Sequence, residues 1–530
     1  MVGAPAGPVP SLGGSEVPLS RLERLARLEA TRFDLLVVGG GISGAAVAEE
    51  AALRGISVAL IERDDYAVGA SGHTSKMLHG GLRYLAQGKV RLVREALRER
   101  SRLLSELDPA WVHPLPFLLP IRGGVWSSLR DRFGTWLYER LAMGRRLGPR
   151  AILTPSEVLG LVPALDPQGL RGGILYWEAV VDDVALTLYR VDSAARSGAV
   201  VVNHMEAVGA DPEPAGGFRV RARDTVTGRP ASIRSRWVVD ATGAWMGRTP
   251  LLPRATPRLS PSKGIHLVFR REKLPIDVAV VLPGPDERPT FVLPVGSLLI
   301  AGTTDTAFQG DPADARAEAA DVAYLFRTLR AAFPKVAFHP SEVVDLYSGV
   351  RPLLAATASS TSELSREDVE AYDPSGGIAV AGGKLTTHRA MAARALRRLP
   401  SAPTAPRPAV RTPNGGSLPE IEQAAVPLSG GTELMARLVR DRRPEDWDEL
   451  RRRVMDSLRF GQAESLEDLV DRRLHALNRR EAGFEMVLAA VAGYVAELRG
   501  LPAGERDGLV RSYRARRERE YSVLEGGPHV

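Results

Sequence analysis

Residues 33–44 read Phe33-Asp34-Leu35-Leu36-Val37-Val38-Gly39-Gly40-Gly41-Ile42-Ser43-Gly44. The run up to Val38 is short and apolar and is bounded by glycines, which predicts a buried parallel strand. A helix rich in alanine is predicted over Ile42–Arg54, and a second strand over Ile56–Ile61. The stretch therefore predicts a β-α-β unit whose first turn carries the pattern G-x-G-x-x-G.

This glycine-rich turn is expected to bind the pyrophosphate of a dinucleotide. Glycines permit the tight turn and the close approach of the backbone, and the free N–H groups at the start of a helix attract the anion. Glu62 ends the second strand, where a carboxylate accepts hydrogen bonds from the adenosine ribose, and an acid at this position argues against NADP. The cofactor contacts predicted in this unit are Gly39, Gly41, Ser43, Gly44 and Glu62.

Two later segments favour FAD over NAD as the cofactor. Val238–Trp245 is a strand that runs into a turn of small residues, which predicts contact of Ala241 and Gly243 with the adenylate half. Val380–Thr387 again reads as strand, glycines and helix, so a second helix N-terminus would face the flavin edge where negative charge grows on reduction. A nicotinamide enzyme has no need of that second helix terminus. The contacts expected there are Gly383, Lys384, Leu385 and Thr386.

The chain has 530 residues, too many for one hydrophobic core, so several domains are expected. Short strands joined by Pro/Gly turns between residues 237 and 301 predict an antiparallel sheet inserted into the nucleotide-binding unit, whereas residues 108–150 read as irregular apart from their basic character. The predicted fold is α/β, with a Rossmann-type FAD-binding domain, an inserted antiparallel β-sheet substrate domain and a helical C-terminal domain.

The predicted boundaries follow from these patterns. Residues 1–30 are expected to be disordered and then helical, residues 400–431 form a proline-rich linker, and residues 432–530 form the helical domain. The oxidoreductase unit is expected over residues 31–399. Its FAD-binding segments are about 33–110, 180–250 and 345–399, and its substrate segments are about 111–180 and 251–345.

The composition excludes several classes of protein. The chain has no cysteine, which excludes disulfides, thiolate metal sites, a catalytic thiol and a cysteinyl-flavin bond. Its net charge of +7 points to anionic partners, but it shows no nucleic-acid-binding motif, so nucleic acid is not an expected partner. No apolar run of about 18 residues and no signal peptide are found. A cytoplasmic protein is predicted.

Several blocks are more specific than the glycine pattern. They are Ser75-Lys76-Met77-Leu78-His79-Gly80-Gly81-Leu82-Arg83-Tyr84-Leu85, Val181-Asp182-Asp183, Gly302-Thr303-Thr304-Asp305, Tyr347-Ser348-Gly349-Val350-Arg351-Pro352-Leu353 and Gly382-Gly383-Lys384-Leu385-Thr386-Thr387. Through these blocks the chain, from about Phe33 to Arg389, resembles the FAD-dependent glycerol-3-phosphate dehydrogenase family of the D-amino-acid-oxidase-like flavoproteins. The resemblance implies oxidation of sn-glycerol 3-phosphate to dihydroxyacetone phosphate, with electrons passing from reduced flavin to a quinone.

The resemblance also implies a set of site residues. Arg83, Tyr84 and Arg366 would bind the substrate, since a guanidinium fork suits a phosphate. His266, Arg351 and Lys384 are the catalytic candidates, and which of them acts as the base stays open. Further cofactor contacts are expected at Ser75, Lys76, His79, Gly80 and Gly81. The chain departs from the family pattern at Gly72-His73-Thr74 and at His388, which stands where the family often has tyrosine.

Other functions and sites stay open as alternatives. The chain could be an oxidase of the same fold that uses oxygen, a 2-hydroxy-acid or amine oxidoreductase, or a flavoprotein kept for binding or assembly. Asp182-Asp183 could be read as a carboxylate pair or as a metal site, but no nearby histidine is expected to complete one. A structural or capping role, and no metal, is therefore expected there.

One basic segment suggests a membrane surface as a partner. Arg122–Arg150 carries seven arginines against two acids, interleaved with tryptophan, phenylalanine and tyrosine, which suits docking on an anionic bilayer. The alternative is a solvated basic helix with a packed apolar face. The expected partners are thus a small phosphorylated substrate, a quinone or other electron acceptor, and the surface of the cytoplasmic membrane, with a homodimer left open.

Overall fold

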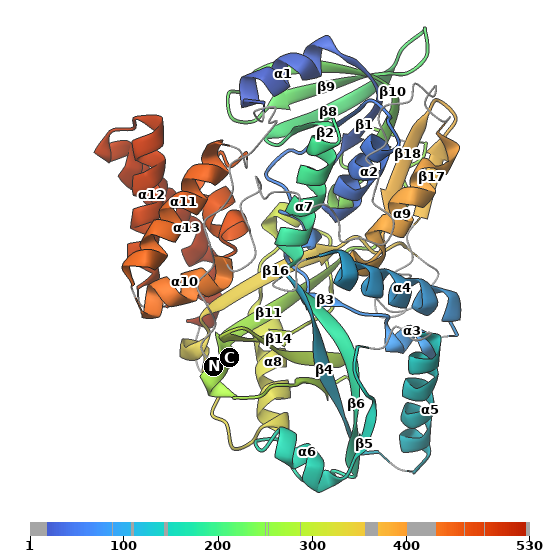
Figure 1. The fold of residues 1–530 in the computed structure, drawn as a ribbon, viewed down its shortest axis with the longest axis vertical. Coiled ribbons are helices and arrows are strands. Elements are labelled where there is room, and N and C mark those ends of the chain that lie inside the picture. The colour runs from blue at the N-terminus through green and yellow to red at the C-terminus, as the bar shows by residue number, and fades with distance from the viewer. Residues whose placement is uncertain are drawn as a thin grey trace, which may run out of the picture.

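The structure, a computed structural model, describes residues 19–355, 369–399 and 431–525, apart from residues 87, 108–110, 124, 143–146, 250, 253, 287, 442, 460–461 and 482. Within these ranges the chain forms two large β-sheets, stacked end to end, and a helical domain beside them (Figure 1). The part of the predicted N-terminal extension up to residue 18 and the predicted linker up to residue 430 lie outside the described residues.

The glycine-bounded run 33–38 lies at the centre of the first sheet. β1 (Arg32–Val38) pairs in parallel with β2 (Val58–Ile61) on one side and with β10 (Pro230–Asp240) on the other. The sheet order is β17-β18-β10-β1-β2-β7, and β9 and β8 continue it from β10. The other strands are β7 (Val200–Val202), β8 (Met205–Pro212), β9 (Phe218–Asp224), β17 (Val369–Asp373) and β18 (Gly377–Ala381).

Apolar side chains leave β1 on both faces, so both faces of the sheet are covered. Leu35 and Val37 pack in one core with α2 (Ile42–Leu53), α7 (Asp183–Arg196) and α9 (His388–Ala395). On the other face, Leu36 and Val38 share a core with β8, β9 and α1 (Arg21–Ala30). A Rossmann-type layer therefore surrounds the glycine-rich turn, and the predicted fold class is confirmed.

The second sheet has the order β15-β11-β14-β13-β12-β4-β6-β3, with β16 beside β11 and β5 beside β6. Its pairs are antiparallel except for β12 and β4, which run parallel and pair at only two positions. The helices α6 (Pro155–Leu161) and α8 (Ala319–Ala332) cover one face, and α3 (Leu82–Ala86) and α4 (Val90–Glu106) pack against the other. The strands are β3 (Met77–Leu78), β4 (Val112–Ile121), β5 (Ala151–Leu153), β6 (Gly172–Val181), β11 (Ser262–Arg270), β12 (Ala279–Pro283), β13 (Pro289–Val295), β14 (Leu298–Gly302), β15 (Thr306–Ala307) and β16 (Asp345–Arg351).

Three details of the sequence-based expectation differ from this arrangement. Residues 108–150 are not irregular, because they contain β4 and α5 (Val125–Leu141). β4 contains three prolines, which are unusual in a strand, and the sequence-based prediction therefore missed it. The prolines lie an even number of residues apart, so the N–H groups that they remove all belong to one edge of the strand. Trp237–Asp240 belongs to the first sheet, where it pairs in parallel with β1, rather than to the inserted one. The boundary at residue 345 moves to the end of β16, which pairs with β11.

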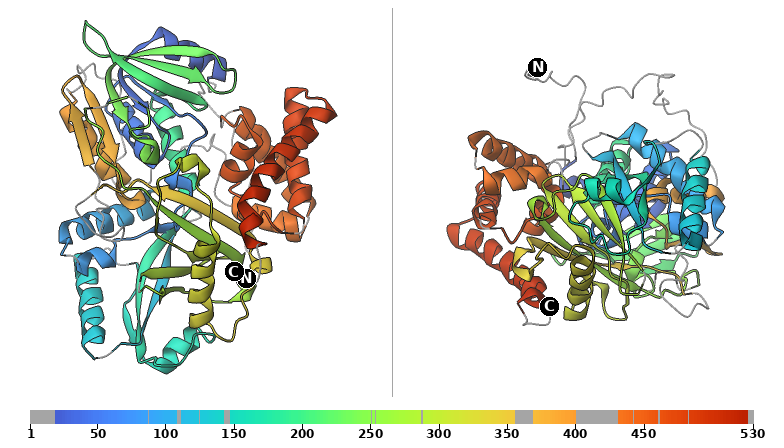
Figure 2. Two further views of the ribbon diagram at one scale, coloured as in Figure 1. Left: turned by 180° about the vertical axis from the view of Figure 1, so that it is seen from behind. Right: turned by 90° about the horizontal axis from the view of Figure 1, so that it is seen from below.

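The helical domain comprises α10 (Gly431–Arg440), α11 (Pro444–Arg459), α12 (Phe484–Arg499) and α13 (Ala503–Tyr521) around its own apolar core. Figure 2 shows it on one side of the molecule. A π-helical turn, Asp468–Arg473, contacts the loops that follow β2 and β7 of the first sheet. Nε of Arg472 and Nη1 of Arg473 lie 2.8 and 2.6 Å from Oδ2 of the fully buried Asp65. A buried charge is stable only when it is paired, so these contacts hold the domain in place.

We predict that Asp65→Asn destabilises the protein by about 3 kcal/mol, because it removes the buried carboxylate that Arg472 and Arg473 share. Asp192→Asn is the matched control, since Asp192 pairs with Arg196 on an exposed helix surface and its loss should cost about 0.5 kcal/mol. Urea unfolding followed by tryptophan fluorescence measures both values. Equal losses in the two variants would contradict the interpretation of Asp65 as a buried interdomain ion pair.

Candidate active site

A cavity of about 1540 Å³ lies where the first sheet meets the second. It is lined by residues that directly follow three neighbouring parallel strands, namely Gly39 after β1, Ala241 after β10 and Gly382 after β18. Carboxyl ends of parallel strands are the usual ligand sites of such sheets, because helices start there and leave free N–H groups. The cavity therefore lies at the position where the sequence predicts a dinucleotide.

The glycine-rich turn is packed too tightly for side chains. A Cβ atom on Gly44 would lie 1.9 Å from the carbonyl oxygen of Gly39, and one on Gly39 would lie 2.5 Å from that of Ala241. Glu62 accepts hydrogen bonds from the amide of Gly40 (2.6 Å) and the amide of Asp64 (2.9 Å). Burial raises the pKa of the Glu62 carboxyl, and these two amide bonds oppose the rise. The turn thus brings bare backbone and one carboxyl to the cavity wall.

The late glycine turn meets the Ser75–Leu85 block across the cavity. Gly382 and Gly383 both have positive φ, which lets the chain reverse after β18. A 3₁₀ turn, Leu385–Thr387, follows before α9 begins, in place of the helix predicted to start directly after the glycines. The amide of His79 donates to Oγ1 of Thr386 (3.2 Å), and Nζ of Lys384 lies 3.6 Å from the ring centre of Tyr84.

His266 lies on β11 at the cavity wall and is almost completely buried. Its Nε2 lies 2.8 Å from Oγ of Ser75, and its ring stacks on Tyr347 with 4.7 Å between centroids. Burial, reinforced by the positive charges of Arg351 and Lys76, holds the pKa of His266 well below its ordinary value. The imidazole is therefore neutral near pH 7 and has a lone pair that can accept a proton.

Arg351 ends β16 beside this histidine. Its Nη2 donates to Oγ1 of Thr303 (2.8 Å) and to the carbonyl of Thr304 (3.1 Å), and Asp305 lies 3.7 Å from its Nη1. A Cβ atom at Gly264 would lie 2.2 Å from the Arg351 guanidinium, so the missing side chain leaves room for it. The bonds to residues 303 and 304 orient a cation that lines the cavity.

Most predicted site residues line this one cavity, and a few do not. Gly44 packs beneath the turn, and the amide of Gly80 donates to the hydroxyl of Tyr138 (2.8 Å). The ammonium group of Lys76 points away to Asp183. The side chain of Arg83 and all of Arg366 lie outside the described residues. The predicted residues that line the cavity are Gly39, Gly41, Ser43, Glu62, Ser75, His79, Gly81, Tyr84, Ala241, Gly243, His266, Arg351, Gly383, Lys384, Leu385 and Thr386.

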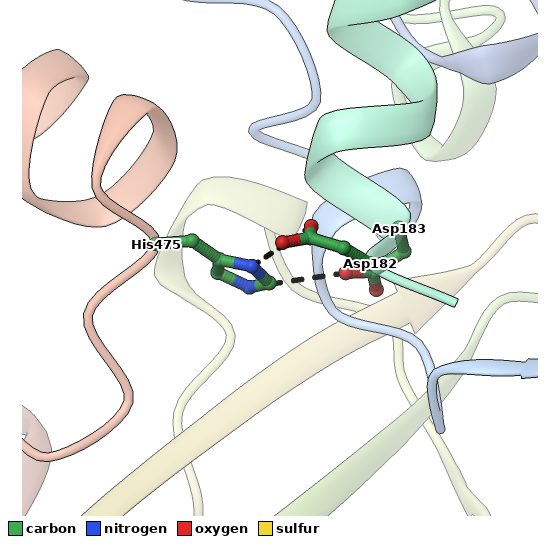
Figure 3. A group of neighbouring side chains, drawn as sticks. All are labelled: Asp182, Asp183 and His475. Carbon is green, nitrogen blue, oxygen red and sulfur yellow. Dashed lines mark ion pairs between the residues drawn. The ribbon is translucent and has the colours of Figure 1, made fainter. Parts of the chain in front are cut away.

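The Asp182-Asp183 pair does have a histidine beside it, which comes from the helical domain. His475 lies with its Nδ1 2.9 Å from Oδ1 of Asp182 (Figure 3), so the expectation that no histidine accompanies the pair was wrong. These three residues could hold a metal ion by distance alone. Nζ of Lys76, however, already lies 2.6 Å from Asp183 and 3.0 Å from His475. The lysine supplies the cation, and Asp182 caps α7.

Several residues at the cavity escaped the sequence-based selection. Thr303 stood inside a quoted block but was given no role, whereas Arg288 stands outside all of the blocks. Ser71 lines the cavity and accepts a hydrogen bond from the amide of Ile42 (2.9 Å), at the start of α2. His388, noted as a departure from the family pattern, is buried outside the cavity and accepts a bond from Arg190 (3.1 Å). It therefore joins α9 to α7.

Residues 34–399 match the model of the FAD dependent oxidoreductase family. The chain is 40% identical over 396 residues to glycerol-3-phosphate dehydrogenase 2 of Mycobacterium tuberculosis, an alignment that covers 74% of this chain and 67% of the relative. It is 34% identical over 377 residues to the aerobic glycerol-3-phosphate dehydrogenase of Bacillus subtilis, which covers 71% of this chain and 68% of that protein.

The fold resembles that of a glycerol-3-phosphate dehydrogenase from Bacillus halodurans, solved in complex with FAD. The TM-score is 0.67 at 25% sequence identity, and the superposition covers 95% of this chain and 97% of that one. The structural likeness therefore extends beyond residues 34–399 and includes the helical domain.

We predict that His266→Gln reduces the loss of stability on acidification. As pH falls through the ordinary histidine value of 6.5, the unfolded chain binds a proton at His266 that the folded chain resists, so the stability present above that pH is lost. Glutamine has no such proton to bind. Urea unfolding at about pH 7.5 and about pH 5.5 gives the loss for each protein. An equal loss in wild type and variant would refute a buried neutral imidazole.

Proposed function

The chain belongs to the FAD dependent oxidoreductase family, and we propose that it oxidises sn-glycerol 3-phosphate to dihydroxyacetone phosphate and passes the electrons to a quinone. The observation that carries this proposal is that a neutral histidine, His266, and two cations, Arg351 and Lys384, all line the same cavity. An alcohol phosphate needs both kinds of group, since it carries a dianion and must lose a hydroxyl proton.

The cofactor is FAD, and the cavity fits it. Pockets for single drug-sized ligands measure about 300–1,000 Å³, so a cavity of about 1540 Å³ has room for a dinucleotide and a small substrate together. The backbone of Gly39–Gly44 and the Glu62 carboxyl would hold the adenosine diphosphate half. The second glycine turn, Gly382–Thr386, would hold the flavin half. When bound, FAD supplies a hydride acceptor.

Residues of the chain bind the phosphate of the substrate and accept its hydroxyl proton. Arg351, oriented by Thr303, presents a guanidinium to the phosphate, and Lys384 adds a second positive charge to the same cavity. His266 accepts the proton of the C2 hydroxyl, because it is neutral while Arg351 stays permanently charged. A bound phosphate dianion would favour the protonated imidazole and so assist this transfer. We therefore assign the base to His266.

We expect anaerobic sn-glycerol 3-phosphate, and not glycerol, to bleach the flavin absorbance near ~450 nm. Arg351→Lys should raise KM for the substrate by about ten- to a hundredfold, because a lysine loses the bidentate contact. His339→Gln, which changes an exposed residue between α8 and β16, is the control and should leave KM unaltered. Bleaching by 2-hydroxy acids or amines, with none by the phosphate, would refute the proposed substrate. Peroxide formation in air at the rate of turnover would refute a quinone as the electron acceptor.

A row of side chains on the second sheet, several of them apolar, supports a quinone as the acceptor. Strand register places His266 beside Gly302, Gly302 beside Phe291, and Phe291 beside Val281, so one row crosses four strands. Leu119 and Tyr176 continue the apolar wall toward β4 and β6. A quinone ring entering along this row would reach the cavity that holds His266 without crossing the polar turns of the first sheet.

Helix α5 supports attachment to a membrane surface. Phe133 and Trp136 are 62% and 46% exposed and lie 5.7 Å apart between ring centroids, with the guanidinium of Arg140 over Trp136. Exposed aromatics with flanking arginines suit the interface of an anionic bilayer. The same helix contacts one residue of the cavity lining, because the hydroxyl of Tyr138 donates a hydrogen bond to Glu178. Among the helices that the structure describes, none is long and apolar enough to cross a membrane.

We predict that the double variant Phe133→Ser, Trp136→Ser weakens binding to vesicles of anionic phospholipid at least about tenfold, since two interfacial aromatic anchors are lost. Turnover with a soluble dye acceptor should stay at the wild-type value. Val226→Ser removes another exposed apolar side chain, on the β9–β10 turn at the opposite end of the molecule (Figure 1), and should leave vesicle binding unchanged. Co-sedimentation with the vesicles measures the binding of both variants. Undiminished binding of the double variant would refute docking through α5.

A further inference from the structure

The helical domain places one side chain directly behind the candidate active site. His475 is 4% exposed, and its Nε2 lies 3.0 Å from Nζ of Lys76 and 3.8 Å from Oδ1 of Asp183. Figure 3 shows the imidazole pointing from the helical domain into the turn that opens α7. His475 and Lys76 both have positive φ, which non-glycine residues adopt at a cost, so the backbone is held to bring the two groups together.

The chemistry of the pair defines the state of the imidazole. An ammonium group only donates hydrogen bonds, so Nε2 of His475 must accept one from Lys76. The ring proton then resides on Nδ1, which faces the carboxylate of Asp182 at 2.9 Å. The imidazole is thus held in one tautomer between a cation and an anion, an arrangement that determines where the Lys76 ammonium lies.

Lys76 and Asp183 in turn hold the residues that touch His266. Oδ2 of Asp183 accepts bonds from the amide (3.0 Å) and the hydroxyl (2.7 Å) of Thr74, next to Ser75. The carbonyl of Thr74 accepts a bond from the hydroxyl of Tyr347 (3.1 Å), whose ring stacks on His266. The Lys76 ammonium also lies 5.4 Å from the centre of that ring. Ser75 and Tyr347, which contact the His266 ring, therefore both depend on this buried pair.

We propose that His475 is a positioning residue of the oxidation reaction. By accepting a hydrogen bond from Lys76, it keeps the Lys76–Asp183 pair in the place that sets Thr74, Ser75 and Tyr347 around His266. The inference rests on the proposed function, because His266 is the base of that reaction. His475 does not reach the cavity itself, so its loss should affect proton transfer and leave phosphate binding intact.

The test compares two substitutions of His475 in the FAD-loaded full-length protein. His475→Phe keeps a ring but removes the acceptor, and kcat with sn-glycerol 3-phosphate should fall about tenfold with KM changed less than about twofold, as expected when a catalytic group is slightly misplaced. His475→Gln restores an acceptor and should recover most of kcat. If His475→Phe loses FAD, the smaller His475→Leu is measured under the same criteria.

His204→Phe is the matched control for domain docking. His204 lies between β7 and β8 of the first sheet and pairs with Asp468 of the helical domain at 2.8 Å. It does not contact His266 and does not line the cavity. It should leave kcat unchanged. An equal fall of kcat in His204→Phe, or none in His475→Phe, would overturn the proposal. If the wild type itself is not reduced by the substrate, the proposed function fails instead, so the two failures are distinguishable.

A second readout does not depend on turnover. The chain has nine histidines, and the ring signals of labelled histidine can be resolved by NMR, with that of His266 assigned by its absence in His266→Gln. The His266 signal should shift in His475→Phe and return toward its wild-type position in His475→Gln. A His266 signal that stays at the wild-type position in His475→Phe would also overturn the proposal.

Discussion

The buried carboxylate of Asp183 is the contact on which the other parts of the molecule depend. It lies at the first residue of α7, which packs on the first sheet, and it binds the segment Thr74–Lys76, which leads into β3 of the second sheet. The helical domain reaches the same point through His475. A carboxylate without solvent must be fully paired, so these three units can occupy only the relative placement that satisfies it.

Local patterns predicted the parts of the fold that local physics controls. The apolar run 33–38, the glycines after it and the alanine-rich helix are consistent at every level, and β1 and α2 form within a residue or two of the expected bounds. Strand β4 was missed because prolines argue against a strand unless the partner of each edge is known. The pairing of β16 with β11 joins residues far apart in the chain, which no periodicity reveals.

The candidate site also contains residues that the sequence could identify and residues that only the packing reveals. Blocks such as Ser348–Leu353 and Gly382–Thr387 carry their own signal, so the residues that line the cavity along them could be selected from sequence. Lys76 was selected too, but its conformation, with positive φ, turns the ammonium to Asp183. His475 stands 399 residues from Lys76 in a charged helical region, where nothing local separates it from a surface histidine. Its role emerges only from packing.

The order of the chain gives the interdomain contacts a consequence for biosynthesis. Asp65, Asp182 and Asp183 leave the ribosome several hundred residues before Arg472, Arg473 and His475. Until that late segment is translated, the nascent oxidoreductase unit holds Asp65 without its two arginines and the turn at α7 without its histidine. The helical domain, translated last, thus supplies the partners of buried carboxylates in the oxidoreductase unit. A chain that ended before this domain would have Asp65, Asp182 and Asp183 without those partners.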